Sequence, residues 1–282
     1  MDDPDGELIL AAEALVPAGL DATLVLLRHG ETEFIVEGRF QGQGETALSP
    51  IGQRQAERAA ERLARPLASP ALPVPAGPPR ELVHSPLRRT TQTADAIAAA
   101  MADELAFGRA IPVRPDPGFL EIGQGEWEGL HRTEIEARWG DVLATWRRTP
   151  LEAWAPGGES IRDVQARVRP AVAMLLATLA EGGVPGTLDR SQVAGYREAL
   201  VEQPWSILVG HDGLFKVLLL TLFDLPLERF WMWSFDLAGI TVIEFRAGRA
   251  VLRAMNLTEH LAPLLDEAAK EATEERQRSG AM

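Results

Sequence analysis

The chain has 282 residues, 46% of them hydrophobic, which is enough for one large domain or two small ones with a sizeable core. Its formal net charge of -13 argues against nucleic acid or an anionic membrane as the main partner. Because there is no cysteine, disulfides, thiol catalysis and cysteine-ligated metals are excluded. No apolar run approaches the ~20 residues of a membrane-spanning helix. The acidic start Met1–Asp5 is unlike a signal peptide, so we expect a soluble, cytoplasmic protein.

Predicted strands and helices alternate along the chain. A run of apolar residues predicts a buried strand over 23–28, and Ser49-Pro50 predicts the capped start of a helix that ends near residue 65. Ser85-Pro86 repeats this helix start. The other elements expected are strands at 81–84, 111–114, 205–209, 240–245 and 250–255, and helices at 85–103, 131–147, 160–181 and 214–222. This alternation predicts an α/β fold, a three-layer αβα sandwich with a mostly parallel central sheet.

The organisation expected is a single domain over residues 23–262. An N-terminal extension at 1–22 precedes it, and a polar C-terminal tail at 263–282 follows it. Clustered prolines predict an irregular surface loop at about 66–80. A second excursion, at about 182–203, is compatible with a lid or with a dimer contact, which leaves a homodimer open.

Basic residues follow three of the predicted strands. Arg28 and His29 end the first strand, Arg88 and Arg89 lie near the start of the helix after the second, and His211 follows a third. In a parallel sheet these junctions lie at one edge, where helix N-termini also favour anions. An imidazole can attack phosphorus while guanidinium groups hold the oxygen atoms. The pattern therefore predicts a phosphate site that contains Arg89, with Arg88 facing solvent.

Longer motifs around these junctions occur in the order found in one known family. They are Arg28-His29-Gly30-Glu31-Thr32, Gly38-Arg39-Phe40-Gln41-Gly42, Leu48-Ser49-Pro50-Ile51-Gly52, Ser85-Pro86-Leu87-Arg88-Arg89, Leu120-Glu121, Gly125-Glu126-Trp127-Glu128-Gly129, Gly157-Gly158-Glu159-Ser160 and Gly210-His211. With these motifs the chain resembles the histidine phosphatase superfamily, in its phosphoglycerate-mutase-like branch, from residue 23 to about residue 255. The resemblance implies a phosphoglycerate-mutase-like fold and a small-molecule phosphoester substrate.

The resemblance also implies a role for each site residue. His29 would take the phosphoryl group as a phosphohistidine, and Glu121 would protonate the leaving alkoxide and then activate water. Glu121 is assigned by resemblance, since Glu126 and Glu128 lie in the same loop. The phosphate contacts would come from Arg28, Gln41, Arg89, His211 and the backbone N–H of Asp212. No metal and no cofactor is implied.

The function expected is a metal-independent phosphomonoester hydrolase that acts on a small phosphorylated metabolite. One alternative is a cofactor-dependent phosphoglycerate mutase, which the short segment between Gly129 and Gly157 disfavours. Another is a catalytically weak phosphate-binding protein of the same fold. It is suggested by Ile35, which stands where the family often has an asparagine that contacts phosphate.

Three further features have a mainly structural interpretation. Trp127 is expected to anchor its loop by packing, and Glu159 to cap or brace the start of a helix. The aromatic segment Phe230–Phe235 fits ordinary core packing or an apolar wall of the substrate cleft, and the sequence leaves both open.

Overall fold

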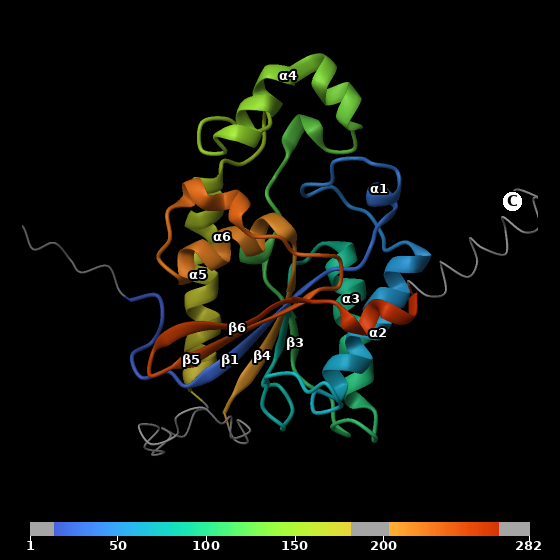
Figure 1. The fold of residues 1–282 in the computed structure, drawn as a ribbon, viewed down its shortest axis with the longest axis vertical. Coiled ribbons are helices and arrows are strands. Elements are labelled where there is room, and N and C mark those ends of the chain that lie inside the picture. Colours follow the sequence, from blue (N-terminus) through green and yellow to red (C-terminus); the bar gives the residue numbers. More distant parts are fainter. Residues whose placement is uncertain (1–13, 182–202, 265–282) are drawn as a thin grey trace, which may run out of the picture.

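A six-stranded sheet forms the centre of the computed structural model, which describes residues 14–181 and 203–264 (Figure 1). The strand order is β3-β2-β4-β1-β5-β6. The strands are β1 (Ala22–Arg28), β2 (Leu82–His84), β3 (Val113–Pro115), β4 (Trp205–Gly210), β5 (Ile240–Arg246) and β6 (Arg249–Leu257). Strands β3, β2, β4 and β1 run parallel, and β5 and β6 pair antiparallel at one side. The expected mostly parallel sheet is therefore confirmed.

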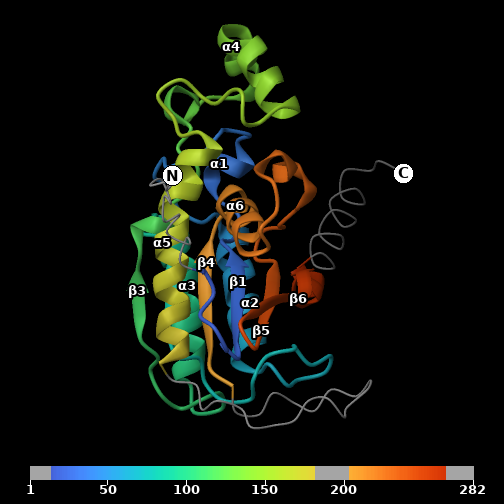
Figure 2. The ribbon, with the colours of Figure 1, turned by 90° about the vertical axis from the view of Figure 1, so that its left-hand side faces the viewer.

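Helices cover both faces of this sheet, as expected for a three-layer sandwich. Helices α2 (Pro50–Ala64) and α3 (Arg88–Ala102) lie on one side, and α5 (Ile161–Ala180) and α6 (Asp212–Leu222) on the other (Figure 1). Helix α4 (Arg132–Arg148) lies beyond the same end of the sheet as the short α1 (Glu33–Val36) (Figure 2). The described residues also form short 3-10 helices, which are η1 (Pro117–Phe119), η2 (Gly125–Trp127), η4 (Leu227–Met232) and η5 (Glu259–Leu261).

Strand β1 is the centre of the hydrophobic core. Its side chains alternate between the faces because successive residues of a strand point to opposite sides. Leu24 and Leu26 pack with α5 and α6, while Val25 and Leu27 pack with α2 and α3. All four are fully buried, which explains why the strand reads as one continuous apolar run.

Helix α3 begins later than the sequence predicts. Ser85 does not cap it: its hydroxyl has no hydrogen-bond partner among the described residues, and its N–H donates to the carbonyl of Val209 at 3.1 Å, which extends the pairing of β2 with β4. Leu87 takes the N-cap position without a side-chain hydrogen bond. The helix start is therefore set by the sheet and not by the Ser-Pro pair.

Other boundaries also differ from the expectations. Strand β3 begins at Val113, because its pairing with β2 begins there. Ile111, which was expected in the strand, precedes this pairing and is buried in the core. Helix α6 begins at Asp212, two residues before the expected start, and α1 was not expected. The proline-rich loop is irregular as predicted, yet it buries Leu72 and Val74.

Parts of the expected organisation lie outside the described residues. They are 1–13 of the extension, 182–202 of the second excursion and 265–282 of the tail. The domain division, the lid and the dimer contact therefore stay predictions. Within 14–181 and 203–264, no helix has the length and apolar character needed to cross a membrane.

A close approach of two glycines fixes the end of β1 against α2. A Cβ atom on Gly30 would overlap the carbonyl oxygen of Gly52, and a Cβ atom on Gly52 would overlap the carbonyl oxygen of Glu31. The obstructing atoms belong to the backbone, so no side-chain rotation relieves either clash. The N-terminus of α2 therefore lies directly against the residues that follow His29.

We expect Gly52→Ala to destabilise the protein by about 1–3 kcal/mol, the typical cost of overpacking. Gly140→Ala is the matched control: it lies inside α4 with no atom within 4 Å of its added Cβ, so we expect a gain of about 0.5–1 kcal/mol. Urea unfolding measures both changes. Equal stability of the two variants would contradict the close contact.

Candidate active site

Two histidines lie side by side where β1 and β4 end. Arg28 pairs with Gly210 in the parallel register, and the His29 N–H donates to the Gly210 carbonyl at 3.1 Å. The next residue, His211, therefore lies beside His29, with 5.2 Å between the ring centroids. His29 is 2% exposed and His211 is fully buried. The expected convergence of these two junctions is present in the structure.

The hydrogen bond of His29 determines its reactive atom. His29 Nδ1 lies 2.6 Å from the carbonyl oxygen of Gly30. A carbonyl oxygen only accepts, so Nδ1 carries the proton and the lone pair is on Nε2. Burial, together with the nearby Arg89 and Arg28 cations, holds the pKa of His29 well below its usual value. His29 is thus a neutral imidazole with a nucleophilic nitrogen.

His211 is a buried side chain whose ring nitrogens lack hydrogen-bond partners in the described part of the chain. Neither of its ring nitrogens makes a hydrogen bond to any described residue. Burial is the largest cause that lowers the pKa of His211, followed by Arg89. An unsatisfied buried polar group typically costs about 1–3 kcal/mol, and a bound ligand can supply the missing partner. The Nε atoms of Arg28 and Arg89 are unsatisfied in the same way.

Arg89 is held in place by backbone carbonyls. It is fully buried, and its terminal nitrogens donate to Gly44 at 2.9 Å and to Gly42 at 2.7 Å. Burial lowers the pKa of Arg89 to about 10, so it remains a cation at neutral pH. Arg88 is exposed, as predicted. Arg28 donates to the Phe235 carbonyl at 2.6 Å.

The carboxylate of Glu121 sits on the N-terminus of α6. Oε1 accepts from the backbone N–H groups of Ile122 and Leu214, both at 2.9 Å, and Oε2 accepts from Gly213 at 3.2 Å. Burial raises the pKa of Glu121, and these hydrogen bonds oppose the rise. Because α6 begins directly after His211, this carboxyl group is held at the N-terminus of the helix that follows the second histidine.

The two other carboxylates of the loop are placed differently. Glu126 is exposed. Glu128 accepts from the backbone N–H groups of Gln43 at 2.8 Å and Gln124 at 2.9 Å. Glu128 therefore holds the loop together, and the geometry favours Glu121 as the acid.

Gln41 and Asp212 contact protein atoms in the structure. Gln41 Oε1 accepts from the Thr32 hydroxyl at 2.7 Å, and the Asp212 carboxylate pairs with Lys216 at 2.6 Å. Ile35 lies half-buried in α1, where its N–H donates to the Thr32 hydroxyl at 3.3 Å. The phosphate contacts expected of Gln41 and of the Asp212 N–H stay predictions.

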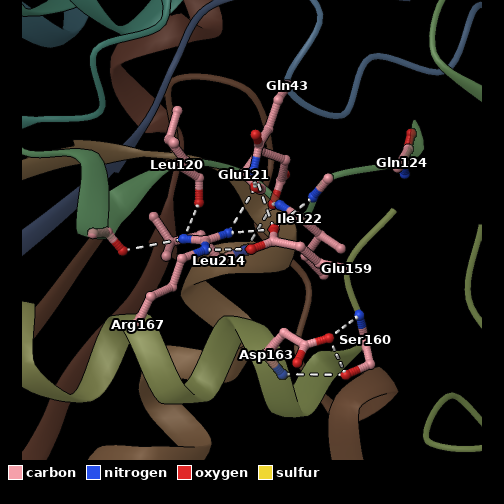
Figure 3. Close-up of polar contacts among 12 residues, drawn as sticks. Gln43, Leu120, Glu121, Ile122, Gln124, Glu159, Ser160, Asp163, Arg167 and Leu214 are labelled. Atoms are coloured by element: carbon pink, nitrogen blue, oxygen red, sulfur yellow. Dashed lines mark hydrogen bonds and ion pairs between the residues drawn. The ribbon is translucent and has the colours of Figure 1, made fainter. Parts of the chain in front are cut away.

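A network behind Glu121 was missed by the sequence analysis (Figure 3). Arg167 of α5 pairs with both oxygens of Glu159, through Nε at 2.7 Å and a terminal nitrogen at 2.8 Å. Ser160 caps α5 together with Asp163, so Glu159 is free to brace the Glu121 loop. The only signal in the sequence is an arginine two helical turns after Glu159, which is a common spacing.

The aromatic residues serve mainly in packing. Trp127 is 1% exposed and contacts Phe40 and Trp146 edge to face, as expected of a loop anchor. The burial of Phe230 and Phe235 supports the packing interpretation of the segment 230–235, and a substrate-facing wall stays a prediction. Phe230 is buried in the core, whereas Trp231 is 42% exposed and lies over Lys216 with 5.0 Å between Nζ and the ring centroid.

Comparison with known proteins decides the family. The model of the histidine phosphatase superfamily (branch 1) matches residues 24–184 and 190–258. The chain belongs to this superfamily. A glucosyl-3-phosphoglycerate phosphatase of Mycobacterium tuberculosis is 36% identical over 204 residues, which are 72% of this chain and 76% of the relative. Phosphoserine phosphatase 1 of Hydrogenobacter thermophilus is 27% identical over 250 residues, 88% of this chain and 98% of the relative.

A solved structure supports the same relationship. The mycobacterial glucosyl-3-phosphoglycerate phosphatase in complex with inorganic phosphate superposes with a TM-score of 0.65 at 31% identity. The alignment covers 85% of this chain and 99% of that chain. The expected superfamily, fold and enzyme class are confirmed, and this chain is a phosphatase of the histidine phosphatase superfamily.

The lowered pKa of His211 gives this phosphatase a pH-dependent stability. In the unfolded chain this histidine has a pKa of about 6.5. When the pH is lowered below that value, the unfolded chain binds a proton that the native imidazole does not, so the free energy of unfolding decreases as the pH decreases. Each such histidine contributes at most about 1.4 kcal/mol per pH unit. We expect His211→Gln to make this decline shallower between pH 6.5 and about 5. Urea unfolding at several pH values measures the slope, and equal slopes would contradict the assignment.

Proposed function

We propose that this phosphatase is a metal-independent phosphomonoester hydrolase that acts through a phosphohistidine on a small phosphorylated metabolite. The observation that carries the proposal is that neutral His29, with its lone pair on Nε2, lies near Arg28 and Arg89, whose buried Nε atoms have no hydrogen-bond partner among the described residues. A nucleophile next to unsatisfied donors is the arrangement that phosphoryl transfer requires.

In the first step, His29 Nε2 attacks phosphorus and the bond from phosphorus to the leaving oxygen breaks. Protonated Glu121 donates its proton to that oxygen, so the product leaves as a neutral alcohol. Arg28, Arg89 and His211 hold the phosphoryl oxygens, where charge develops in the transition state. The cations supply the stabilisation that a metal ion provides in other phosphatases.

In the second step, water attacks the phosphohistidine. Glu121, now a carboxylate, takes a proton from the water as the bond between phosphorus and Nε2 breaks. Inorganic phosphate leaves, and neutral His29 is regenerated. The hydrogen bonds from Ile122, Gly213 and Leu214 support the carboxylate between the steps. Two displacements at phosphorus give overall retention of its configuration.

The substrate class proposed is a small phosphorylated metabolite. The relatives are named for glucosyl-3-phosphoglycerate and for phosphoserine, which differ in size but are both phosphomonoesters. The half-exposed Trp231 offers an apolar surface for a bulky leaving group. The net charge of -13 supports an enzyme without a nucleic acid or anionic membrane partner, and the location proposed is the cytoplasm.

We expect His29→Ala to abolish hydrolysis of p-nitrophenyl phosphate, while the wild type retains full activity in EDTA. Rapid quenching of the wild type with 32P-labelled substrate yields an acid-labile, base-stable phosphohistidine at His29. Arg88→Ala is the control and keeps its activity, because Arg88 is exposed. Loss of wild-type activity in EDTA would refute metal independence, and a label on another residue would refute the nucleophile.

We expect Glu121→Gln to lower kcat/KM for an alkyl phosphate by about 10²–10⁴, the usual contribution of a general acid. The loss is smaller for p-nitrophenyl phosphate, because p-nitrophenolate leaves without a proton. Steady-state kinetics on the two substrates gives the ratio. The control Glu126→Gln changes neither value, because Glu126 is exposed. Equal losses on both substrates would exclude Glu121 as the acid.

A further inference from the structure

We infer that Arg167 is a positioning residue that holds Glu121 where it can transfer its proton. The inference rests on the proposed role of Glu121 as general acid and base. Arg167 projects from α5, is 20% exposed at its side chain, and lies behind the loop that carries Glu121 (Figure 3). Its hydrogen bonds to the described residues go to the Glu121 loop and to Glu159, and its charge adds to the lowering of the His211 pKa.

All three nitrogens of the Arg167 guanidinium group donate hydrogen bonds to the Glu121 loop or to Glu159. One terminal nitrogen donates to the carbonyls of Gly118 at 3.1 Å and Leu120 at 2.8 Å. The other donates to the carbonyl of Glu121 itself at 2.8 Å and to Glu159. The planar guanidinium fixes these directions together, a geometry that a lysine ammonium cannot reproduce.

The loop needs this support because it has no regular secondary structure to fix its backbone. Residues 120–124 lie between η1 and η2 without regular structure. Glu159 holds the far end of this segment: its Oε2 accepts from the Gly123 N–H at 2.8 Å, and its own N–H donates to the Gly123 carbonyl at 2.8 Å. Arg167 and Glu159 therefore fix the segment on both sides of Glu121.

The network also connects the acid to the phosphate arginine. Gln43 Nε2 donates to the Glu121 carbonyl at 3.0 Å and to Glu159 at 3.1 Å. Gln43 belongs to the turn whose Gly42 and Gly44 carbonyls bind Arg89. The backbone of Glu121 is thus tied to the turn that positions Arg89, while the carboxylate is tied to α6.

Positioning matters because proton transfer requires hydrogen-bond distance. A general acid acts over about 2.6–3.2 Å, and a misplacement of about 1 Å costs on the order of 10²-fold in rate. Loss of Arg167 leaves three carbonyls and Glu159 without their shared partner. We therefore expect a loss of the function of Glu121, beyond any loss of stability.

The test measures kcat/KM for an alkyl phosphate and for p-nitrophenyl phosphate in Arg167→Ala, Glu121→Gln and the double variant. We expect Arg167→Ala to lower the alkyl value by about 10–100-fold and the aryl value by less. The double variant stays within about twofold of Glu121→Gln, because two residues that act as a unit are not additive. Arg167→Lys restores activity only in part. Arg162→Ala, exposed on the same helix, is the control and changes neither value.

Two results would overturn the inference. The first is that Arg167→Ala lowers kcat/KM equally on both substrates. The second is that the losses of the two single variants multiply in the double variant. Either result would mean that Arg167 does not act through Glu121. If Glu121→Gln itself lowers kcat/KM equally on both substrates, Glu121 is not the general acid. This result is obtained without any Arg167 variant, so it is distinguishable from a failure of the inference on Arg167. Urea unfolding monitors each protein. If Arg167→Ala does not fold, Arg167→Lys and Glu159→Gln carry the same comparison.

Discussion

The burial of guanidinium cations against two imidazoles is the constraint on which the rest of the site depends. Arg89 and His211 are fully buried, and His29 is almost so. Burial, together with the cations, keeps both imidazoles neutral, and the hydrogen bonds of Arg89 go to backbone carbonyls. Positive charge is therefore concentrated at one place within a protein of net charge -13. In the proposed mechanism a phosphoryl group would relieve the repulsion among these cations and supply the missing hydrogen bonds, so that binding and catalysis would share one electrostatic origin.

The fold maintains this arrangement through backbone contacts. Parallel pairing of β1 with β4 places His29 and His211 together, and the glycine contact between Gly30 and Gly52 fixes the end of β1 against α2. The core on both faces of β1 leaves the strand no room to slip. A shift of one residue would exchange its two faces and separate the histidines. Stability and site geometry therefore depend on the same strand.

Several of these features follow from the sequence because they depend on local patterns. The apolar run before Arg28 identifies the central strand, and the strand ends identify both histidines and the contrast between Arg88 and Arg89. The later start of α3 does not follow, because Ser85 is drawn into sheet pairing by Val209, far away in the chain. Arg167 does not follow either: its partners are mostly backbone carbonyls, and any residue type supplies a carbonyl. Long-range backbone contacts leave no mark in composition or spacing.

Helix α6 has a consequence for how motion affects the two chemical steps. It begins directly after His211, and its first N–H groups hold the Glu121 carboxylate, while Arg167 and Gln43 hold the Glu121 backbone. A small tilt of α6 therefore acts on His211 and on the Glu121 carboxylate at once. In the proposed mechanism such a tilt would change both the formation and the breakdown of the phosphohistidine, so substitutions along the buried face of α6, remote from the substrate, would act on both rates at once.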